Sequence, residues 1–187
     1  MNDSTRFRLN RKDAVILFID VQEKLSAVMD PATFAAVQEN LRRWIEGARI
    51  LGVPLVWTEQ YVKGLGPTVA PLRAAMPAGL KPIEKLVFSC AAVEQVKEAI
   101  RGKSQVIAIG METHVCVWQT VRDLEELGVR TFVPADAVIS RFEVNRQVGL
   151  DLMRQLGTSV ITTELGLFDL TQTSGTDEFR AISKLVK

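Results

Sequence analysis

The stretch that decides the fold is Ala14-Val15-Ile16-Leu17-Phe18-Ile19, an unbroken apolar run that ends at Asp20. A short run of this kind is typical of a strand buried on both faces of a parallel sheet. Asp30-Pro31 then predicts a helix start, because an N-cap residue is followed by proline at the first helical position. Apolar residues follow at spacings of three and four and predict a helix that Gly52 closes. They are Phe34, Val37, Leu41, Trp44, Ile45 and Ala48.

Segments of strand and helix character alternate along the rest of the chain. Glycine separates a helical stripe from a β-rich run at Gly52, Gly128 and Gly157. Further strands are predicted at 53–57, 105–109, 131–133 and 159–162, with helices over 91–101 and after Cys116. Strands that alternate with helices pair in parallel through right-handed crossovers. The pattern predicts one α/β domain over 1–187: a doubly wound, Rossmann-like three-layer fold, with a parallel sheet of about six strands and helices on both faces.

Two stretches interrupt this alternation. Residues 60–82 are rich in glycine and proline and are predicted to form a long loop, which in a compact domain is often a functional rim. The segment 171–187 is predicted to be a polar linker followed by a C-terminal helix, in which Phe179, Ile182 and Leu185 recur at spacings of three. That helix closes the core of this chain or docks on a neighbouring subunit, and the sequence does not decide between the two.

Composition narrows the class of partner. The chain has 187 residues, 47% of them apolar, and 23 basic residues balance 22 acidic ones to a net charge of +1. A protein that binds nucleic acid mainly through phosphates needs a basic surplus, so no nucleic-acid partner is expected. The basic cluster at 6–12 is interpreted as a solvated leader. No uncharged run approaches the ~20 residues of a membrane helix, and no apolar signal-peptide region is visible, so no membrane partner is expected.

The cysteine and histidine counts bear on compartment and metal chemistry. Cys90 and Cys116 form no CxxC motif and no disulfide framework, which favours a reducing cytoplasm. His114 is the only histidine, and this excludes a His-rich metal site. A magnesium site of carboxylates and water stays open, but no motif supports one. We therefore expect no cofactor and no metal, and a small molecule as the substrate.

Three residues whose side chains could take part in catalysis lie near strand ends. Asp20 follows the first strand, Lys85 lies near a boundary between loop and strand, and Cys116 follows the 105–109 strand at the start of a helix. Ligands of open parallel sheets bind at the carboxyl ends of the strands. A helix N-terminus and a nearby lysine favour a thiolate, and an aspartate can accept its proton. Each residue alone has an ordinary structural interpretation: Asp20 as a helix cap, Lys85 as a surface lysine and Cys116 as a buried thiol. Their convergence on one edge of a sheet favours a catalytic site over these separate structural interpretations.

The segments around these residues resemble three signature blocks of the isochorismatase-like cysteine hydrolases. The blocks are Phe18-Ile19-Asp20-Val21-Gln22, Glu84-Lys85 with Phe88-Ser89, and Gly110-Met111-Glu112-Thr113-His114-Val115-Cys116-Val117. The stretch 58–68 resembles the isochorismatase domain-containing branch, and 134–141 resembles the block after the family's fifth strand. The resemblance runs from about residue 12 to 168, and the block that contains Cys116 is its most specific part.

The resemblance implies a role for each residue. Cys116 would be the nucleophile that attacks a carbonyl or imine carbon, and Asp20 would take the thiol proton and later pass it to a leaving amine. Lys85 would stabilise the thiolate and the carboxylate. The family has a cis peptide that corresponds to Met111-Glu112, which would bring the backbone N–H groups of Glu112 and Cys116 together as an oxyanion hole. Family members commonly form homo-oligomers.

Departures from the family limit the substrate. Its nicotinamidases carry an Asp-x-His pair and a further histidine that hold a metal, whereas Thr58-Glu59-Gln60-Tyr61 contains no histidine, so nicotinamide is a poor expectation. Isochorismatases proper, which cleave an enol ether, typically lack the cysteine. The intact Asp20, Lys85 and Cys116 favour hydrolysis of a small amide-type C–N bond through an acyl-enzyme. We expect five side chains to face the ligand, although capping or packing explains each about equally well. They are Gln22, Glu59, Gln60, Thr113 and Trp118.

Two other readings compete with the hydrolase. One is a binding or interaction protein that keeps the fold without turnover, but a binding module has no need to keep Asp20, Lys85 and Cys116 together. The other is a redox-sensing thiol protein, for which Cys90 is the only candidate resolving thiol. His114 is expected to line or cap the turn before Cys116 rather than to act as a base, because adjacent residues on a helix point about 100° apart. The hydrolase is favoured, with its substrate and oligomeric state open.

Overall fold

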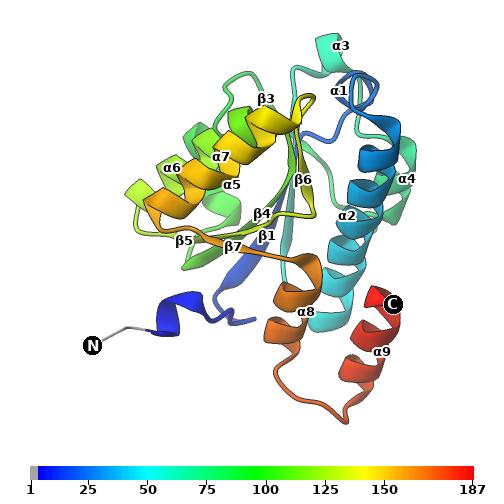
Figure 1. Cartoon of the computed structure of the whole chain (residues 1–187), viewed down its shortest axis with the longest axis vertical. Coiled ribbons are helices and arrows are strands. Elements are labelled where there is room, and N and C mark those ends of the chain that lie inside the picture. Colours follow the sequence, from blue (N-terminus) through cyan, green and yellow to red (C-terminus); the bar gives the residue numbers. More distant parts are fainter. Residues whose placement is uncertain (1–3) are drawn as a thin grey trace.

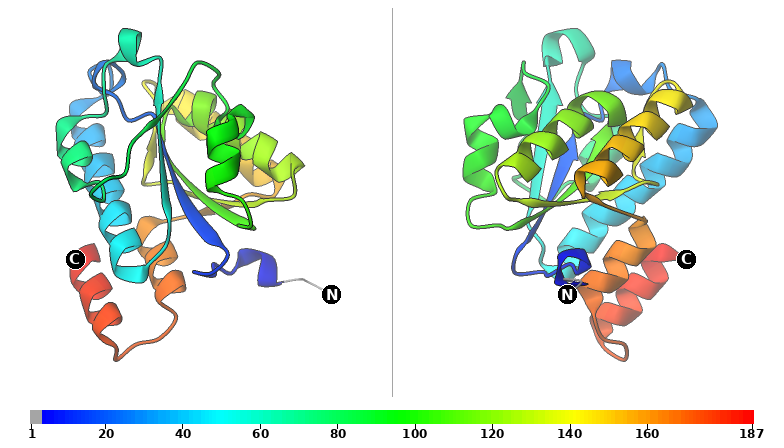
Figure 2. Two further views of the ribbon diagram at one scale, coloured as in Figure 1. Left: turned by 180° about the vertical axis from the view of Figure 1, so that it is seen from behind. Right: turned by 60° about the vertical axis from the view of Figure 1, so that its left-hand side comes forward.

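The computed structural model describes residues 4–187 and places one parallel sheet between two layers of helices (Figures 1 and 2). The sheet runs in the order β3-β2-β1-β4-β5-β7, and the short β6 pairs with β4. The strands are β1 (Ala14–Ile19), β2 (Leu55–Gln60), β3 (Ile83–Lys85), β4 (Gln105–Met111), β5 (Arg130–Pro134), β6 (Val138–Ile139) and β7 (Ser159–Ile161). The α-helices are α1 (Glu23–Ser26), α2 (Pro31–Leu51), α3 (Val62–Leu65), α4 (Ala70–Ala75), α5 (Glu94–Ala99), α6 (Trp118–Glu126), α7 (Glu143–Leu156), α8 (Thr163–Thr171) and α9 (Asp177–Val186). Three short helical turns are η1 (Ser4–Phe7), η2 (Cys90–Ala92) and the π-helical η3 (Thr113–Val117).

The doubly wound parallel sheet predicted from the sequence is confirmed. Every ladder between its strands is parallel. Strand β1 has the predicted bounds, and every one of its residues is fully buried. Helix α2 begins as predicted, because the Asp30 carboxylate accepts a hydrogen bond from the backbone N–H of Thr33 at 2.8 Å. It ends at Gly52, which takes the left-handed conformation at φ 65°.

The prediction of a long loop over 60–82 is wrong. The stretch contains α3 and α4, and Leu72 of α4 is buried in the core. These helices have four and six residues, too few for an apolar period to show in a sequence. Strand β2 lies later than the predicted 53–57, so Thr58 to Gln60 form its last residues. Lys85 is the last residue of β3, and α8 was not predicted at all.

Each face of the sheet has its own helical layer and its own apolar core. Helices α2, α4, α8 and α9 cover one face, and α5, α6 and α7 cover the other (Figure 2). The side chains of β1 alternate between the two cores, with Phe18 in one and Ile19 in the other. Ile182 of α9 is fully buried in the first core, so the C-terminal helix closes the core of its own chain. Within residues 4–187, no helix is both long and apolar enough to cross a membrane.

The path of the chain through the sheet places a crevice at the carboxyl ends of β1 and β4. From β1 the chain moves outward through β2 and β3, then returns to β4 and moves the other way through β5 and β7. Strands β1 and β4 are therefore neighbours whose connections leave in opposite directions, and Ile19 pairs with Gly110 at their ends. Open α/β sheets bind ligands at such a switch point.

Candidate active site

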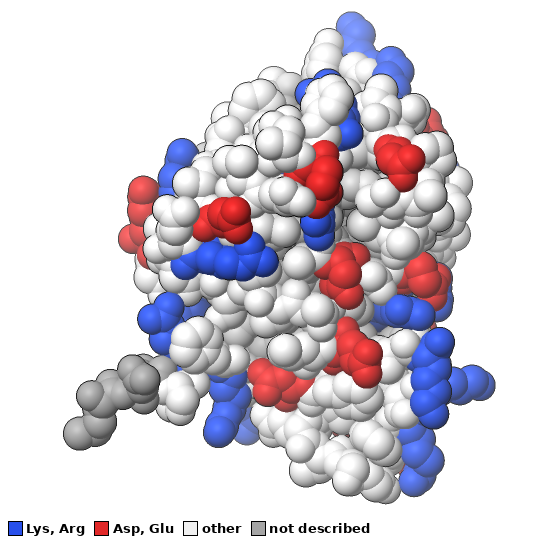
Figure 3. Space-filling view, in the orientation of Figure 1, with Lys and Arg blue, Asp and Glu red and all other residues white. Residues whose placement is uncertain are grey.

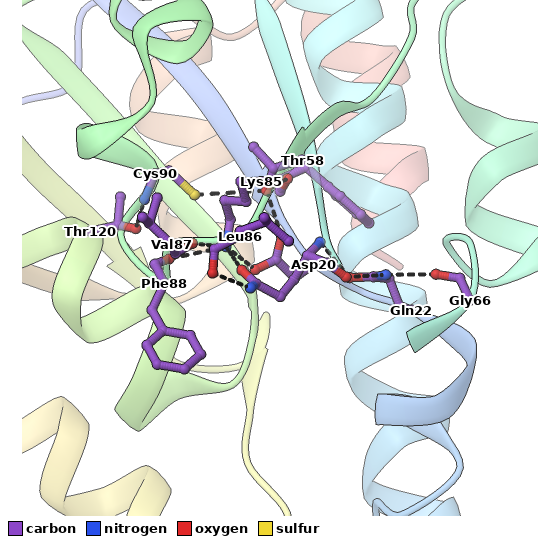
Figure 4. Close-up of polar contacts among 12 residues, drawn as sticks. Asp20, Gln22, Thr58, Gly66, Lys85, Leu86, Val87, Phe88, Cys90 and Thr120 are labelled. Carbon is purple, nitrogen blue, oxygen red and sulfur yellow. Dashed lines mark hydrogen bonds and ion pairs between the residues drawn. The ribbon is translucent and has the colours of Figure 1, made fainter. Parts of the chain in front are cut away.

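Asp20 is the first residue after β1 and is fully buried at the switch point. Its backbone takes the left-handed conformation at φ 49°, unusual for a residue other than glycine. Its Oδ1 accepts a hydrogen bond from the Thr58 hydroxyl at 2.8 Å, and its Oδ2 lies 2.6 Å from Lys85 Nζ (Figure 4). The carboxylate is thus held by groups from β2 and β3.

Lys85 carries a buried ammonium group surrounded by oxygen atoms. Besides Asp20, Nζ donates to Gln60 Oε1 at 2.7 Å, to the Phe88 carbonyl at 3.0 Å and to the Val87 carbonyl at 3.3 Å. Burial alone would lower the pKa of Lys85, but the nearby Asp20 charge and the two thiols outweigh burial and raise it. The lysine therefore remains a cation at neutral pH.

Cys116 lies in η3, directly before α6, with 5% of its surface exposed. Burial raises the pKa of the Cys116 thiol, and the Asp20 charge and a hydrogen bond to Asp20 raise it further, while Lys85 partly offsets them. The sequence had suggested a thiolate at a helix N-terminus. The structure corrects that expectation, since burial and the facing carboxylate outweigh the lysine. Cys116 is a thiol at rest, next to a group that can accept its proton.

The turn between β4 and η3 contains the Met111-Glu112 peptide bond, which is cis. Gly110 precedes it at φ 123°, and a Cβ atom at that position would lie 2.1 Å from the Ile19 carbonyl oxygen. Only glycine lets β4 approach β1 so closely there. Glu112 Oε1 accepts hydrogen bonds from the backbone N–H of Arg141 at 3.0 Å and from its Nε at 3.2 Å. Glu112 thereby ties this turn to the residues after β6.

Three of the five side chains expected to face a ligand bind the protein's own atoms. Gln22 donates to the carbonyls of Gln60 and Gly66 at 2.8 and 2.6 Å and accepts from the Gln60 N–H at 2.7 Å. Glu59 Oε1 accepts from the Thr68 N–H at 2.6 Å. Gln60 links Lys85 to the Leu86 carbonyl, which accepts from its Nε2 at 2.8 Å. Gln22 and Glu59 therefore hold the loop that contains α3, and Gln60 holds the lysine.

The other two expected side chains lie on either side of Cys116, Thr113 at the start of η3 and Trp118 at the start of α6. Thr113 is fully buried, and its hydroxyl has no hydrogen-bond partner in the structure. Trp118 is partly buried against the core beneath α6. His114 lies 3.0 Å from the Ser140 hydroxyl through Nδ1 and 3.4 Å from Asn145 Nδ2 through Nε2. Those contacts link η3 to the start of α7, in keeping with the expected place of His114 at the turn.

Sequence reasoning missed Thr58 and Arg141 as parts of the site, and also the carbonyls after Lys85. Thr58 could have been found, because it directly follows the predicted strand over 53–57, as Asp20 follows the strand over 14–19. Arg141 and the carbonyls carry no such signal, since their positions depend on how β6 and the 86–89 loop fold back over the sheet.

The described residues do not fit a metal like that of the nicotinamidases. Within residues 4–187, no group of three or more His, Cys, Asp or Glu side chains gathers in a way that could hold an ion. Glu59 and Gln60, in the stretch that would correspond to the metal ligands, have oxygens that bind Thr68 and Lys85.

The fold and the site together define a three-layer α/β protein whose switch point holds an aspartate, a lysine and a thiol. The Isochorismatase domain model matches residues 14–165. Isochorismatase domain-containing protein 2 from Danio rerio is 39% identical over 182 residues, which cover 96% of this chain and 89% of that protein. The chain therefore belongs to the isochorismatase family, which includes hydrolases.

Two solved structures are similar over nearly the whole chain. The MAR1 ribonuclease from Caenorhabditis elegans superimposes with a TM-score of 0.90 at 34% identity, covering 96% of this chain and 92% of that one. YcaC from Pseudomonas aeruginosa, described with hexane-2,5-diol and covalent acrylamide, has a TM-score of 0.85 at 25% identity. That match covers 95% of this chain and 91% of that one.

Proposed function

We propose that this protein is a cysteine hydrolase that cleaves a small amide-type C–N bond through a covalent acyl-enzyme. The observation that carries the proposal is the buried cluster at the ends of β1, β3 and β4, where the Asp20 carboxylate lies 2.6 Å from Lys85 Nζ and its charge acts on the Cys116 thiol. A nucleophile, a proton acceptor and a fixed cation together are what acyl transfer requires.

The first half of the reaction forms the acyl-enzyme. Cys116 Sγ bonds to the substrate carbonyl carbon while Asp20 takes the thiol proton, and the carbonyl electron pair moves onto oxygen. The backbone N–H groups of Glu112 and Cys116 stabilise that oxyanion. When the carbonyl reforms, the C–N bond breaks and the leaving nitrogen takes the proton from Asp20.

The second half releases the acid. Water attacks the thioester carbon as Asp20 accepts a proton from it, and the C–S bond breaks. The proton on Asp20 then returns to Sγ, which restores the thiol and the carboxylate. Lys85 stays protonated throughout and stabilises whichever of Asp20 and Cys116 carries the negative charge. Because the resting thiol has a raised pKa, proton transfer to Asp20 accompanies attack instead of preceding it.

The names of the similar solved structures point to two kinds of chemistry, covalent reaction with a small amide and cleavage of RNA. Covalent acrylamide on YcaC is an adduct of an electrophilic amide on a relative of the same fold. The worm relative is named a ribonuclease, but Lys85 is the one buried cation among residues 4–187, and Asp20, Gln60 and loop carbonyls surround it. On the face shown in Figure 3, basic and acidic side chains are interspersed instead of forming a basic surface for phosphates. A small neutral amide suits this site better than RNA.

Further parts of the proposal concern the surroundings of the site. The unpartnered Thr113 hydroxyl and the partly buried Trp118 would contact the substrate. The free Cys90 and Cys116 suit a reducing cytoplasm.

We propose a homo-oligomer built on the exposed face of α7, which presents valine and leucine at spacings of four: Val144, Val148, Leu152 and Leu156.

The test is the rate of iodoacetamide modification at each cysteine as a function of pH, read by mass spectrometry. Wild type is compared with Asp20→Asn and Lys85→Met. Cys90 is fully buried, and burial and the Asp20 charge raise its pKa to about 11, so it serves as the unactivated thiol in the same protein. We expect Cys116 to react at least ~10-fold faster than Cys90 near neutral pH and to lose that advantage in both variants.

Equal and slow reaction at both cysteines in all three proteins would rule out the activated nucleophile and favour the binding-protein alternative. Fast reaction would justify a screen of small primary amides and ureas, scored by ammonia release. Cys116→Ser is the control for that screen, since it keeps the shape of the site but weakens the nucleophile.

A further inference from the structure

Thr58 contacts Asp20, and the proposed reaction has not used it. It is fully buried near the end of β2, and its hydroxyl oxygen is 2.8 Å from Asp20 Oδ1 (Figure 4). The same oxygen lies 3.5 Å from the Phe18 carbonyl and 3.7 Å from Cys90 Sγ. Three possible partners therefore compete for one hydroxyl group.

The chemistry of the partners fixes the direction of each bond. The Asp20 carboxylate pairs with Lys85 and can only accept, so the single Thr58 proton points at Oδ1, the nearer acceptor. Burial and the Asp20 charge raise the pKa of Cys90 to about 11, so its sulfur keeps a proton at neutral pH. A thiol is a weak donor, and the Thr58 oxygen has a free lone pair to accept from it.

Cys90 is held in place independently of Thr58. It begins η2, and its backbone N–H donates to the Thr120 hydroxyl of α6 at 2.8 Å. The result is a buried chain of donors that runs from Cys90 through Thr58 to Asp20, with Lys85 on the other carboxylate oxygen. The titratable groups that face Asp20 from the elements packed around it are Lys85, Cys90 and Cys116.

We infer that Thr58 is a positioning residue for Asp20, and that Cys90 acts through Thr58 by directing its hydroxyl proton toward the carboxylate. This inference rests on the proposed role of Asp20 as the proton acceptor. With Oδ1 bound to Thr58 and Oδ2 to Lys85, the carboxylate cannot rotate away from Cys116. A hydrogen bond donated to a charged group favours the charged form, so removal of the Thr58 hydroxyl should change the pH dependence of Cys116 alkylation.

The experiment measures the pH profile of Cys116 alkylation in proteins where Cys116 is the only thiol. The reference carries Cys90→Ser, which keeps a donor at that position. Thr58→Val removes the hydroxyl at nearly constant volume, and Thr58→Ser restores it. Thr131→Val is the matched control, because Thr131 is also buried and its hydroxyl is hydrogen-bonded, to Glu125 and Thr158, at the opposite ends of the strands.

We expect Thr58→Val to move the midpoint of the acidic limb up by about one pH unit, the effect of losing one hydrogen bond to a charged group. Thr58→Ser should return the midpoint to within about a third of a unit of the reference. Thr131→Val should lower the melting temperature without moving the midpoint. A Thr58→Val midpoint equal to the reference would overturn the inference.

A second pair of variants keeps the test decisive if Thr58→Val does not fold. Cys90→Ala removes the donor to Thr58, whereas Cys90→Ser keeps it, and both leave Cys116 as the sole cysteine. We expect the Ala variant to have the higher midpoint, and equal midpoints would contradict the part assigned to Cys90. Slow alkylation of wild-type Cys116 at every pH would overturn both the hydrolase proposal and this inference, whereas an unmoved midpoint with fast alkylation would overturn this inference alone.

Discussion

Asp20 and Lys85 have side chains with no exposed surface, so each charge depends on the other. Removing one partner of a buried pair leaves an uncompensated charge, which typically costs about 3–5 kcal/mol, whereas removing both costs much less. The ion pair is therefore evidence of function more than of stability. A pair of apolar residues of similar size would stabilise the core of this sheet at least as well as these two charges.

A double-mutant cycle checks this by urea unfolding. We expect Asp20→Asn and Lys85→Met each to lower the free energy of unfolding by about 3 kcal/mol, and the double variant to lose less than the sum of the two. Glu46→Gln is the control, because Glu46 pairs with Arg49 on the exposed face of α2 and should cost under ~1 kcal/mol. Additive losses for the double variant would show that the two charges do not interact.

Stability should fall in alkaline solution for an identifiable reason. Burial and the Asp20 charge raise the pKa of Cys90 from 9.0 to about 11, so the unfolded chain releases its thiol proton at a lower pH than the folded chain does. The unfolded state then binds fewer protons than the folded state, and stability falls as pH rises from about 9 to 11. The raised pKa values of Cys116 and Lys85 act in the same direction.

Urea unfolding at about pH 8 and about pH 11 measures the effect. We expect Cys90→Ser to retain about 2 kcal/mol of the stability that wild type loses between these two conditions, since serine does not titrate there. The rest of the loss, from Cys116 and Lys85, should persist in the variant. Identical losses in both proteins would show that Cys90 ionises equally well folded and unfolded.

Some elements of this fold could be predicted from local sequence patterns, and others could not. The alternation of apolar runs and helical stripes was enough to predict β1, α2 and the parallel sheet, because each has a period or a cap that is local. The carbonyls that hold Lys85, the tie from Glu112 to Arg141 and the helices α3 and α4 depend on contacts between distant segments. The same limit explains why Gln22 and Glu59 were expected to face a ligand: their types suit binding, and only the folded loop reveals their backbone partners.

Gly110 provides a test at this scale. We expect Gly110→Ala to lower the free energy of unfolding by more than about 2 kcal/mol and to slow Cys116 alkylation, because the new methyl group would collide with the Ile19 carbonyl of β1. Gly128→Ala is the matched control, since Gly128 has a positive φ of 77° and nothing within 4 Å of the added carbon. It should cost about 1 kcal/mol and leave alkylation unchanged. Equal effects of the two substitutions would refute the close approach of β1 and β4.

At the scale of the whole molecule, the two faces of the sheet are covered unequally. The first helical layer includes α9, which the chain adds after completing the sheet (Figure 1). On the other side, α7 leaves an apolar face in solvent. An apolar stripe along two or more turns of a helix is typical of an interface between proteins. The closed core beneath α9 and the open face of α7 support the proposal that the subunits of a homo-oligomer meet on α7.

Light scattering combined with size exclusion tests that placement. We expect wild type to elute as a defined oligomer and Val148→Glu to dissociate it, with little change in the melting temperature of the released subunit. Val28→Glu is the control, because Val28 is exposed to a similar extent but lies away from α7. A monomeric wild type, or an oligomer that survives Val148→Glu, would move the interface elsewhere.

The burial of β1 has a consequence for how the protein loses function. All six residues of this strand have no exposed surface, and strands flank it on both sides, so its amide protons can exchange with deuterium only when the sheet itself opens. Asp20 directly follows this buried strand. The site cannot fray ahead of the molecule, so heat should abolish the excess reactivity of Cys116 over Cys90 and the folded structure in a single step.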